Sequence, residues 1–137
     1  MKRILQIAAL AMTLGFIGSG TTVADDLKLK TGPAQRIDAP FRLFATDNVW
    51  TQLLLDTRDG RVWQVCFTVN ADGFSGKAPI SVKPLVDDIG AKPGRFTLYP
   101  TANMWTFLLL DQEDGRVWQC QFAPEAKNRF ILPLEQP

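Results

Sequence analysis

Two pairs of aspartates occur at the same spacing in this chain: Asp56 with Asp59, and Asp111 with Asp114. Two carboxylates can hydrolyse a glycosidic bond, one acting as an acid and the other as a base or nucleophile. Each pair, however, brackets an Asp-Gly turn between apolar runs, where aspartate commonly accepts hydrogen bonds from the turn backbone. We therefore predict that these acids shape turns, and we place a carboxylate-based hydrolase last among the candidate functions.

Other catalytic groups are sparse in the sequence. The chain has no histidine, which removes the commonest general base, most nucleophilic triads and most catalytic zinc sites. The two cysteines, Cys66 and Cys120, are too far apart for a Cys-x-x-Cys redox motif. The segment 56–60 lacks the alternating oxygen ligands of a calcium loop. The sequence thus predicts a protein that is not an enzyme, with no catalytic residues, no metal ligands and no cofactor.

A repeat with a period of 55 residues organises the segments that carry these groups. Residues 41–67 align with residues 96–122 without a gap, and 17 of the 27 aligned positions are identical. A period of this length indicates a duplicated supersecondary unit. The first copy carries an additional loop, residues 70–77, that is rich in glycine and polar side chains.

Each copy has the pattern of short antiparallel strands joined by turns. The expected strands are 41–45, 50–56, 61–69 and 80–83 in the first copy, and 96–99, 105–111, 116–122 and 130–132 in the second. Beyond the N-terminal segment, no stretch shows a sustained helical period. We predict an all-β antiparallel fold in which two tandem four-stranded repeats form a small sandwich or barrel. Propeller-like blades that oligomerise are the alternative.

The hydrophobic pattern favours a three-residue loop in the hairpin of each copy, with Thr57 opposite Arg61. Leu55 then lies opposite Trp63, and the second copy places Trp118 in the same way, so that one face is almost purely apolar. A four-residue loop would shift the pairing by one residue and mix leucine with glutamine on both faces. We therefore predict the three-residue loop, and we expect both of these tryptophans in the core.

The opposite face of each hairpin mixes apolar and polar side chains. Such a surface usually packs against another sheet, a partner or a ligand. Both copies keep tryptophan at its first position and glutamine near its middle, whereas a glutamine of the first copy is replaced by phenylalanine in the second. Packing under neighbouring strands remains the alternative to a binding role. The predicted binding residues are Trp50, Gln64, Trp105, Phe107 and Gln119.

The predicted register also bears on the two cysteines. It places Cys120 on the apolar face and Cys66 on the mixed face, at positions that the repeat does not match. A disulfide needs Cα atoms within about 7 Å and converging side chains. We therefore predict that the two cysteines do not pair within one chain.

The first residues of the chain have the order of a secretory signal peptide. Lys2 and Arg3 precede an apolar run, residues 4–17, and small residues follow up to Ala24. The apolar run is shorter than the about 20 residues that a transmembrane helix needs. We expect cleavage near Asp25, a periplasmic or secreted protein, and no stable membrane insertion after cleavage.

The remaining chain has balanced charge. Without the two basic residues of the signal segment, 13 basic residues stand against 14 acidic ones. Nucleic acids and anionic membranes require a basic excess, so neither is expected as a partner. The predicted organisation is a signal peptide (1–24), an N-terminal extension (25–40), repeat 1 (41–85), a linker (86–95) and repeat 2 (96–137), with both repeats in one domain.

These observations favour a non-enzymatic binding protein outside the cytoplasm. The leading hypothesis is recognition of another protein, as by an inhibitor, immunity protein or accessory factor. The alternative is a carbohydrate or cell-wall binding module that uses its exposed aromatic side chains. Self-association as a homo-oligomer and a glycan ligand both remain open.

Overall fold

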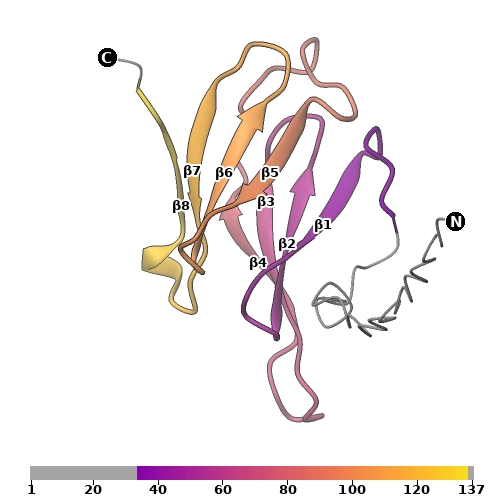
Figure 1. The fold of residues 1–137 in the computed structure, drawn as a ribbon. Coiled ribbons are helices and arrows are strands. Elements are labelled where there is room, and N and C mark those ends of the chain that lie inside the picture. Colours follow the sequence, from indigo (N-terminus) through magenta and orange to yellow (C-terminus); the bar gives the residue numbers. More distant parts are fainter. Residues whose placement is uncertain (1–33, 136–137) are drawn as a thin grey trace, which may run out of the picture. The chain divides into compact units, whose positions relative to one another are not determined.

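Two antiparallel four-stranded sheets make up nearly all of residues 34–135, which are the residues described in this computed structural model (Figure 1). The first sheet contains β1 (Phe41–Ala45), β2 (Thr51–Asp56), β3 (Val62–Cys66) and β4 (Gly76–Ser81), in that order. The second contains β5 (Phe96–Pro100), β6 (Thr106–Asp111), β7 (Val117–Gln121) and β8 (Phe130–Pro133), with a short 3-10 helix, η1 (Ala126–Asn128), before its last strand. Each repeat thus forms one sheet in which consecutive strands are neighbours.

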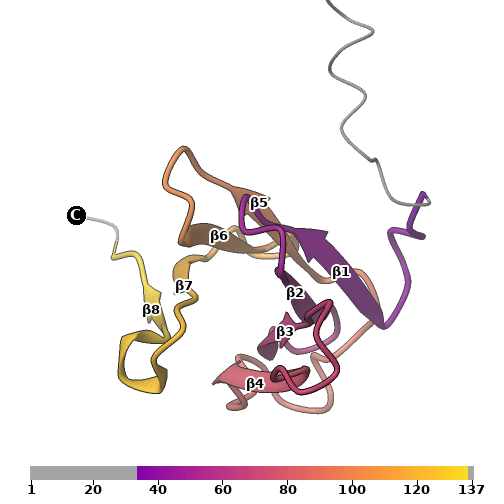
Figure 2. The same ribbon diagram turned by 90° about the horizontal axis from the view of Figure 1, so that it is seen from below.

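The predicted all-β fold with two four-stranded antiparallel repeats is confirmed. Among the described residues the two sheets are not joined into a closed barrel, and their arrangement is that of a sandwich (Figure 2). One strand differs from its expected bounds, because β4 begins at Gly76 and pairs Lys77 with Val65. Part of the expected loop 70–77 is therefore strand.

The predicted hairpin register is wrong by one residue in both repeats. The Asp56 N–H donates to the Arg61 carbonyl at 2.9 Å, so Thr57–Gly60 form a four-residue loop. Leu54 consequently pairs with Trp63, and the same pattern recurs 55 residues later. Gly60 ends the loop with a φ of 80°, which a side chain at that position would strain.

The register determines which residues share a face, because partners across two strands point to the same side of a sheet. We call the face of each sheet that packs on the other sheet its inner face, and the opposite face its outer face. The inner face of repeat 1 consists of Arg42, Phe44, Thr51, Leu53, Leu55, Val62 and Gln64, and its outer face of Phe41, Leu43, Gln52, Leu54, Trp63, Val65 and Phe67. The inner face of repeat 2 consists of Phe96, Leu98, Phe107, Leu109, Trp118, Cys120 and Phe122, and its outer face of Tyr99, Thr106, Leu108, Leu110, Val117, Gln119 and Gln121.

The two repeats bury opposite faces. Leu53 and Leu55 are fully buried in repeat 1, whereas the matching residues of repeat 2, Leu108 and Leu110, are only half-buried. Conversely, Leu98 is 3% exposed and its counterpart Leu43 is 42% exposed. The sequence pattern could not select the register for this reason: each repeat has one buried and one half-covered face, so neither face is a plain polar surface.

The core lies between the two inner faces and is rich in aromatic rings. Phe96 lies 6.1 Å from Trp118, and Phe122 lies 6.2 Å from Phe107, measured between ring centroids. Side chains of both repeats belong to this one cluster. Burial of such large apolar side chains stabilises each by about 1.5–3 kcal/mol relative to exposure.

The turn of the first hairpin also joins the two repeats. Phe96 donates its N–H to the Thr57 carbonyl at 2.8 Å, and Gly94 donates to the Thr57 hydroxyl at 3.0 Å. Farther along the inner faces, Ala123 donates its N–H to the Gln64 side-chain oxygen at 3.3 Å. These bonds fix the position of β5 and of the end of β7 relative to repeat 1.

Strand β1 lies at one edge of the first sheet, and a side chain occupies its free backbone groups. The Gln35 amide donates to the Leu43 carbonyl at 2.5 Å and accepts from the Leu43 N–H at 2.7 Å. This pair of bonds imitates the pairing that a neighbouring strand would make.

Candidate binding surface

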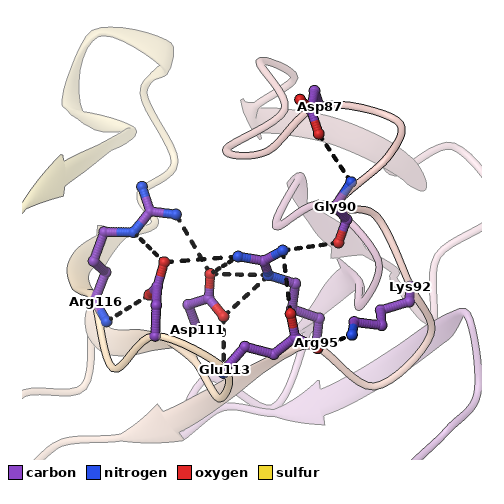
Figure 3. A network of polar contacts seen from close by, with 8 residues as sticks. Asp87, Gly90, Lys92, Arg95, Asp111, Glu113 and Arg116 are labelled. Carbon is purple, nitrogen blue, oxygen red and sulfur yellow. Dashed lines mark hydrogen bonds and ion pairs between the residues drawn. The ribbon is translucent and has the colours of Figure 1, made fainter.

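The repeated aspartates lie in networks of charge at the hairpin turns (Figure 3). In repeat 2 the carboxylate of Asp111 has no exposed surface and accepts hydrogen bonds from Arg95 at 2.8–3.1 Å. Arg95 also lies 3.3 Å from Glu113 and 3.6 Å from Asp114. Its guanidinium, 11% exposed, is therefore compensated by acids from the same turn.

In both repeats the aspartates accept backbone hydrogen bonds, as the turn interpretation predicts. Asp56 accepts from the N–H two residues ahead at 3.1 Å, and Asp59 does the same at 3.2 Å. Asp111 and Asp114 make the matching bonds, each at 3.0 Å. The structural role of these four carboxylates is confirmed.

The charge state of these carboxylates does not suit a general acid. Burial raises the pKa of the Asp56 carboxyl, but hydrogen bonds from Arg58 and the charges of Arg58 and Arg61 lower it further, so that the net shift is downward. The pKa of Asp114 is also lowered, first by the Arg116 N–H. A glycosidase acid needs the opposite shift, because it must hold a proton near neutral pH.

The lowered pKa of Asp56 predicts acid sensitivity. A carboxyl whose pKa is lower in the folded state contributes full stability above its unfolded pKa of about 3.9 and loses it as the pH falls through the folded value. We expect the free energy of unfolding, measured with urea, to fall between pH 5 and pH 2. The Asp56→Asn variant should start less stable and lose less over the same interval. An equal loss in both proteins would contradict this assignment.

The outer face of repeat 1 is an apolar surface that the rest of the described chain leaves half-covered. Phe41, Leu43 and Phe67 are 49%, 42% and 40% exposed. Trp50, 45% exposed, meets the Phe67 ring edge to face at 6.2 Å. Trp63 is half-buried beneath two cations, because the Arg61 guanidinium lies 5.8 Å and the Lys77 ammonium 6.0 Å from the tryptophan ring.

The outer face of repeat 2 is also apolar and half-covered. Leu108, Leu110 and Val117 are each half-buried, and Tyr99 is 50% exposed. Gln119 lies among them, next to Leu132 of β8, which is 53% exposed. Exposed apolar surfaces of this kind mark interaction sites in soluble proteins.

No family model, curated protein or solved structure matches this chain. Within residues 34–135, no group of three or more cysteine and acidic side chains is placed to hold a metal ion. The same residues contain no helix with the length and apolar character to cross a bilayer. The two outer faces are therefore the features from which a function can be argued.

The five predicted binding residues do not share one exposed face, which corrects the expected grouping. Gln64 is 4% exposed and Phe107 is 3% exposed, because both lie on inner faces. Trp50 is exposed, and Gln119 is half-buried on the outer face of repeat 2. Trp105 packs against Phe122 at 5.3 Å. The one-residue error in register moved the first two residues to the wrong side of their sheets.

The tryptophans follow the same correction. Trp118 is 6% exposed and lies in the core, as predicted, but Trp63 lies on the outer face. Trp50 and Trp105 precede β2 and β6, and each donates its N–H to an asparagine side chain two residues earlier, at 3.0 and 2.9 Å. Trp105 also lines a shallow hollow of about 440 Å³ together with Gln121, Lys127 and Phe130.

The cysteines were placed on different faces by the wrong register, and that argument fails. Cys66 pairs with Thr51 and Cys120 with Phe107, so both lie on the inner sides of their sheets. Both are free thiols in the structure. Burial raises the pKa of the Cys120 thiol to about 12.

This burial predicts unequal thiol reactivity. Because the thiolate is the reacting form, Cys120 should be nearly inert in the folded protein at pH 8, with a thiolate fraction of about one in ten thousand. Cys66, which is half-buried, should react first. Ellman's reagent should titrate one thiol rapidly in native buffer and two in denaturant. Two fast thiols in the native protein, or none in denaturant, would contradict the prediction.

Proposed function

We propose that this chain is a non-enzymatic binding protein of the periplasm or extracellular space, and that it recognises another protein. The observation that carries the proposal is the outer face of repeat 1, with Phe41, Leu43 and Phe67 each at least 40% exposed on one side of a regular sheet. A solvated sheet face normally carries polar side chains, whereas this one carries the aromatic and aliphatic side chains found at the centres of protein interfaces.

The surroundings of this face also favour recognition of a protein over catalysis. The chain has no histidine, and its paired aspartates are held by arginines in turns. Arg58, Arg61 and Lys77 lie close to the aromatic rings of the same face. An apolar centre with charged side chains at its margin is the composition of a protein-binding surface.

The location outside the cytoplasm rests on the amino-acid sequence. The charged, apolar and then small residues of segment 1–24 have the order of a signal peptide. This segment lies outside the described residues.

Photo-crosslinking in the producing cell tests the proposal. A photoreactive amino acid at position 43 should form adducts with protein, because Leu43 is at the centre of the exposed face. The same probe at position 89 is the control, since Ile89 is 97% exposed but lies between the sheets in sequence, outside both faces. Adducts at position 43 with glycan alone would instead support the carbohydrate-binding alternative, and no adduct at all would contradict both.

A further inference from the structure

We propose that the protein bound by these faces is a second copy of this chain. In this arrangement the outer face of repeat 1 of one copy packs on the outer face of repeat 2 of the next, head to tail. The inference rests on the proposed function, because it names the partner of the same surface. Its argument comes from the interface between the two repeats of one chain.

The outer face of repeat 1 is nearly a duplicate of a surface that is already buried. Shifted by 55 residues, its members coincide with the inner face of repeat 2, which packs on repeat 1. Five of the seven positions carry the same residue type. The identical pairs are Phe41 and Phe96, Leu43 and Leu98, Leu54 and Leu109, Trp63 and Trp118, and Phe67 and Phe122.

The outer face of repeat 2 likewise duplicates the inner face of repeat 1. The identical pairs are Thr51 and Thr106, Leu53 and Leu108, Leu55 and Leu110, Val62 and Val117, and Gln64 and Gln119. The two remaining positions replace Arg42 with Thr97 and Phe44 with Tyr99. The two outer faces therefore have the residues that the two inner faces use to bind each other.

The internal interface also supplies a hydrogen bond for the contact between copies. Inside the chain, the Gln64 side chain accepts from the Ala123 N–H at the end of β7. The equivalent residues are Gln119 on the outer face of repeat 2 and Thr68 just after β3. We expect the Thr68 N–H of one copy to donate to the Gln119 side chain of the next.

The geometry of such a contact determines the kind of assembly. The internal interface joins different surfaces, so a copy of it between chains is heterologous, and each chain keeps one free face for the next. Repetition gives a ring if the rotation closes and a filament if it does not. A ring of four to eight four-stranded sheets is a β-propeller, and a closed ring would therefore hold about two to four copies of this chain.

The test uses the purified chain and sedimentation velocity. Leu43→Arg alters the outer face of repeat 1, and Tyr99→Arg alters that of repeat 2, at positions that are 42% and 50% exposed. Because both sites are half-exposed, the fold should persist, and circular dichroism melts verify this. Ile89→Arg is the control. We expect the wild type and the control to be oligomeric, and each of the other two variants to raise the dissociation constant by about tenfold or more.

Mixing the two variants distinguishes a head-to-tail contact from other modes of association. Each variant retains one intact face, and these faces are complementary, so an equal mixture should form a pair with twice the monomer mass. If Tyr99→Arg alone remained a dimer, the outer face of repeat 1 would bind itself, and the proposal would be overturned. A folded wild type that stays monomeric at all soluble concentrations would also overturn it.

The outcome separates this inference from the proposed function. A monomeric wild type whose position 43 still crosslinks to a different protein in cells would refute self-association and leave the proposed function standing. A monomeric wild type without protein adducts would refute both.

Discussion

Replacing Phe96 with alanine should lower the free energy of unfolding by about 3–5 kcal/mol, the range for removing a fully buried phenylalanine. The Phe96 side chain has no exposed surface, lies 6.1 Å from the Trp118 ring and contacts the neighbourhood of Gly60. Truncation would leave a cavity between the two inner faces that the rigid hairpin turn cannot fill. Urea unfolding of the wild type and the variant measures the difference.

The repeat provides a matched control for this substitution. Phe41 occupies the same position in repeat 1 but is 49% exposed, with the Arg58 guanidinium 5.1 Å from its ring. Phe41→Ala should cost less than about 1 kcal/mol, in the range of surface substitutions. The comparison requires dilute protein, because association would add its own stabilisation. Equal losses at the two positions would show that both faces are buried to the same extent.

Replacing Asp111 with alanine should cost about 3–5 kcal/mol, the range for removing one partner of a buried ion pair. The variant leaves the guanidinium of Arg95, only 11% exposed, without its closest carboxylate, and it removes the hydrogen bond to the Glu113 N–H. Glu113 and Asp114 remain within 3.6 Å of Arg95, so the lower end of this range is expected.

Two further variants test the physical reason for that loss. Asp114→Ala removes an acid that contacts the same arginine but is 40% exposed, and it should cost about 1 kcal/mol or less. The double variant Arg95→Met/Asp111→Leu removes both buried charges and should recover much of the stability that Asp111→Ala loses. If the double variant were less stable than Asp111→Ala, the arginine would contribute through packing more than through its charge.

Much of the fold could be predicted because the responsible signals are local. The Asp59-Gly60 and Asp114-Gly115 steps lie between apolar runs and identify both central hairpins, and the repeat identifies the two sheets. The register could not be predicted, because Leu53-Leu54-Leu55 offers leucine to both faces. Which of these leucines is buried depends on the side from which the other repeat approaches, and that information is absent from the strand itself.

The same limitation explains the mixed result for the candidate site. Trp50 is exposed because it precedes β2 in a turn, a feature that the sequence pattern contains. Gln64 and Phe107 were assigned by face, and the face was wrong. The alignment of the two repeats held a signal that could have revealed the outer faces: each position has a counterpart, and tandem units that pack in one direction must bury opposite sides.

The side chain of Gln35 has a consequence for how this chain can associate. By occupying the Leu43 N–H and carbonyl, it caps the backbone edge of β1, at which a foreign strand could otherwise add. Growth through that edge would be open-ended and indifferent to sequence, as in cross-β fibrils. With the edge capped, contact at this end of the molecule depends on side chains, which can be selective and reversible.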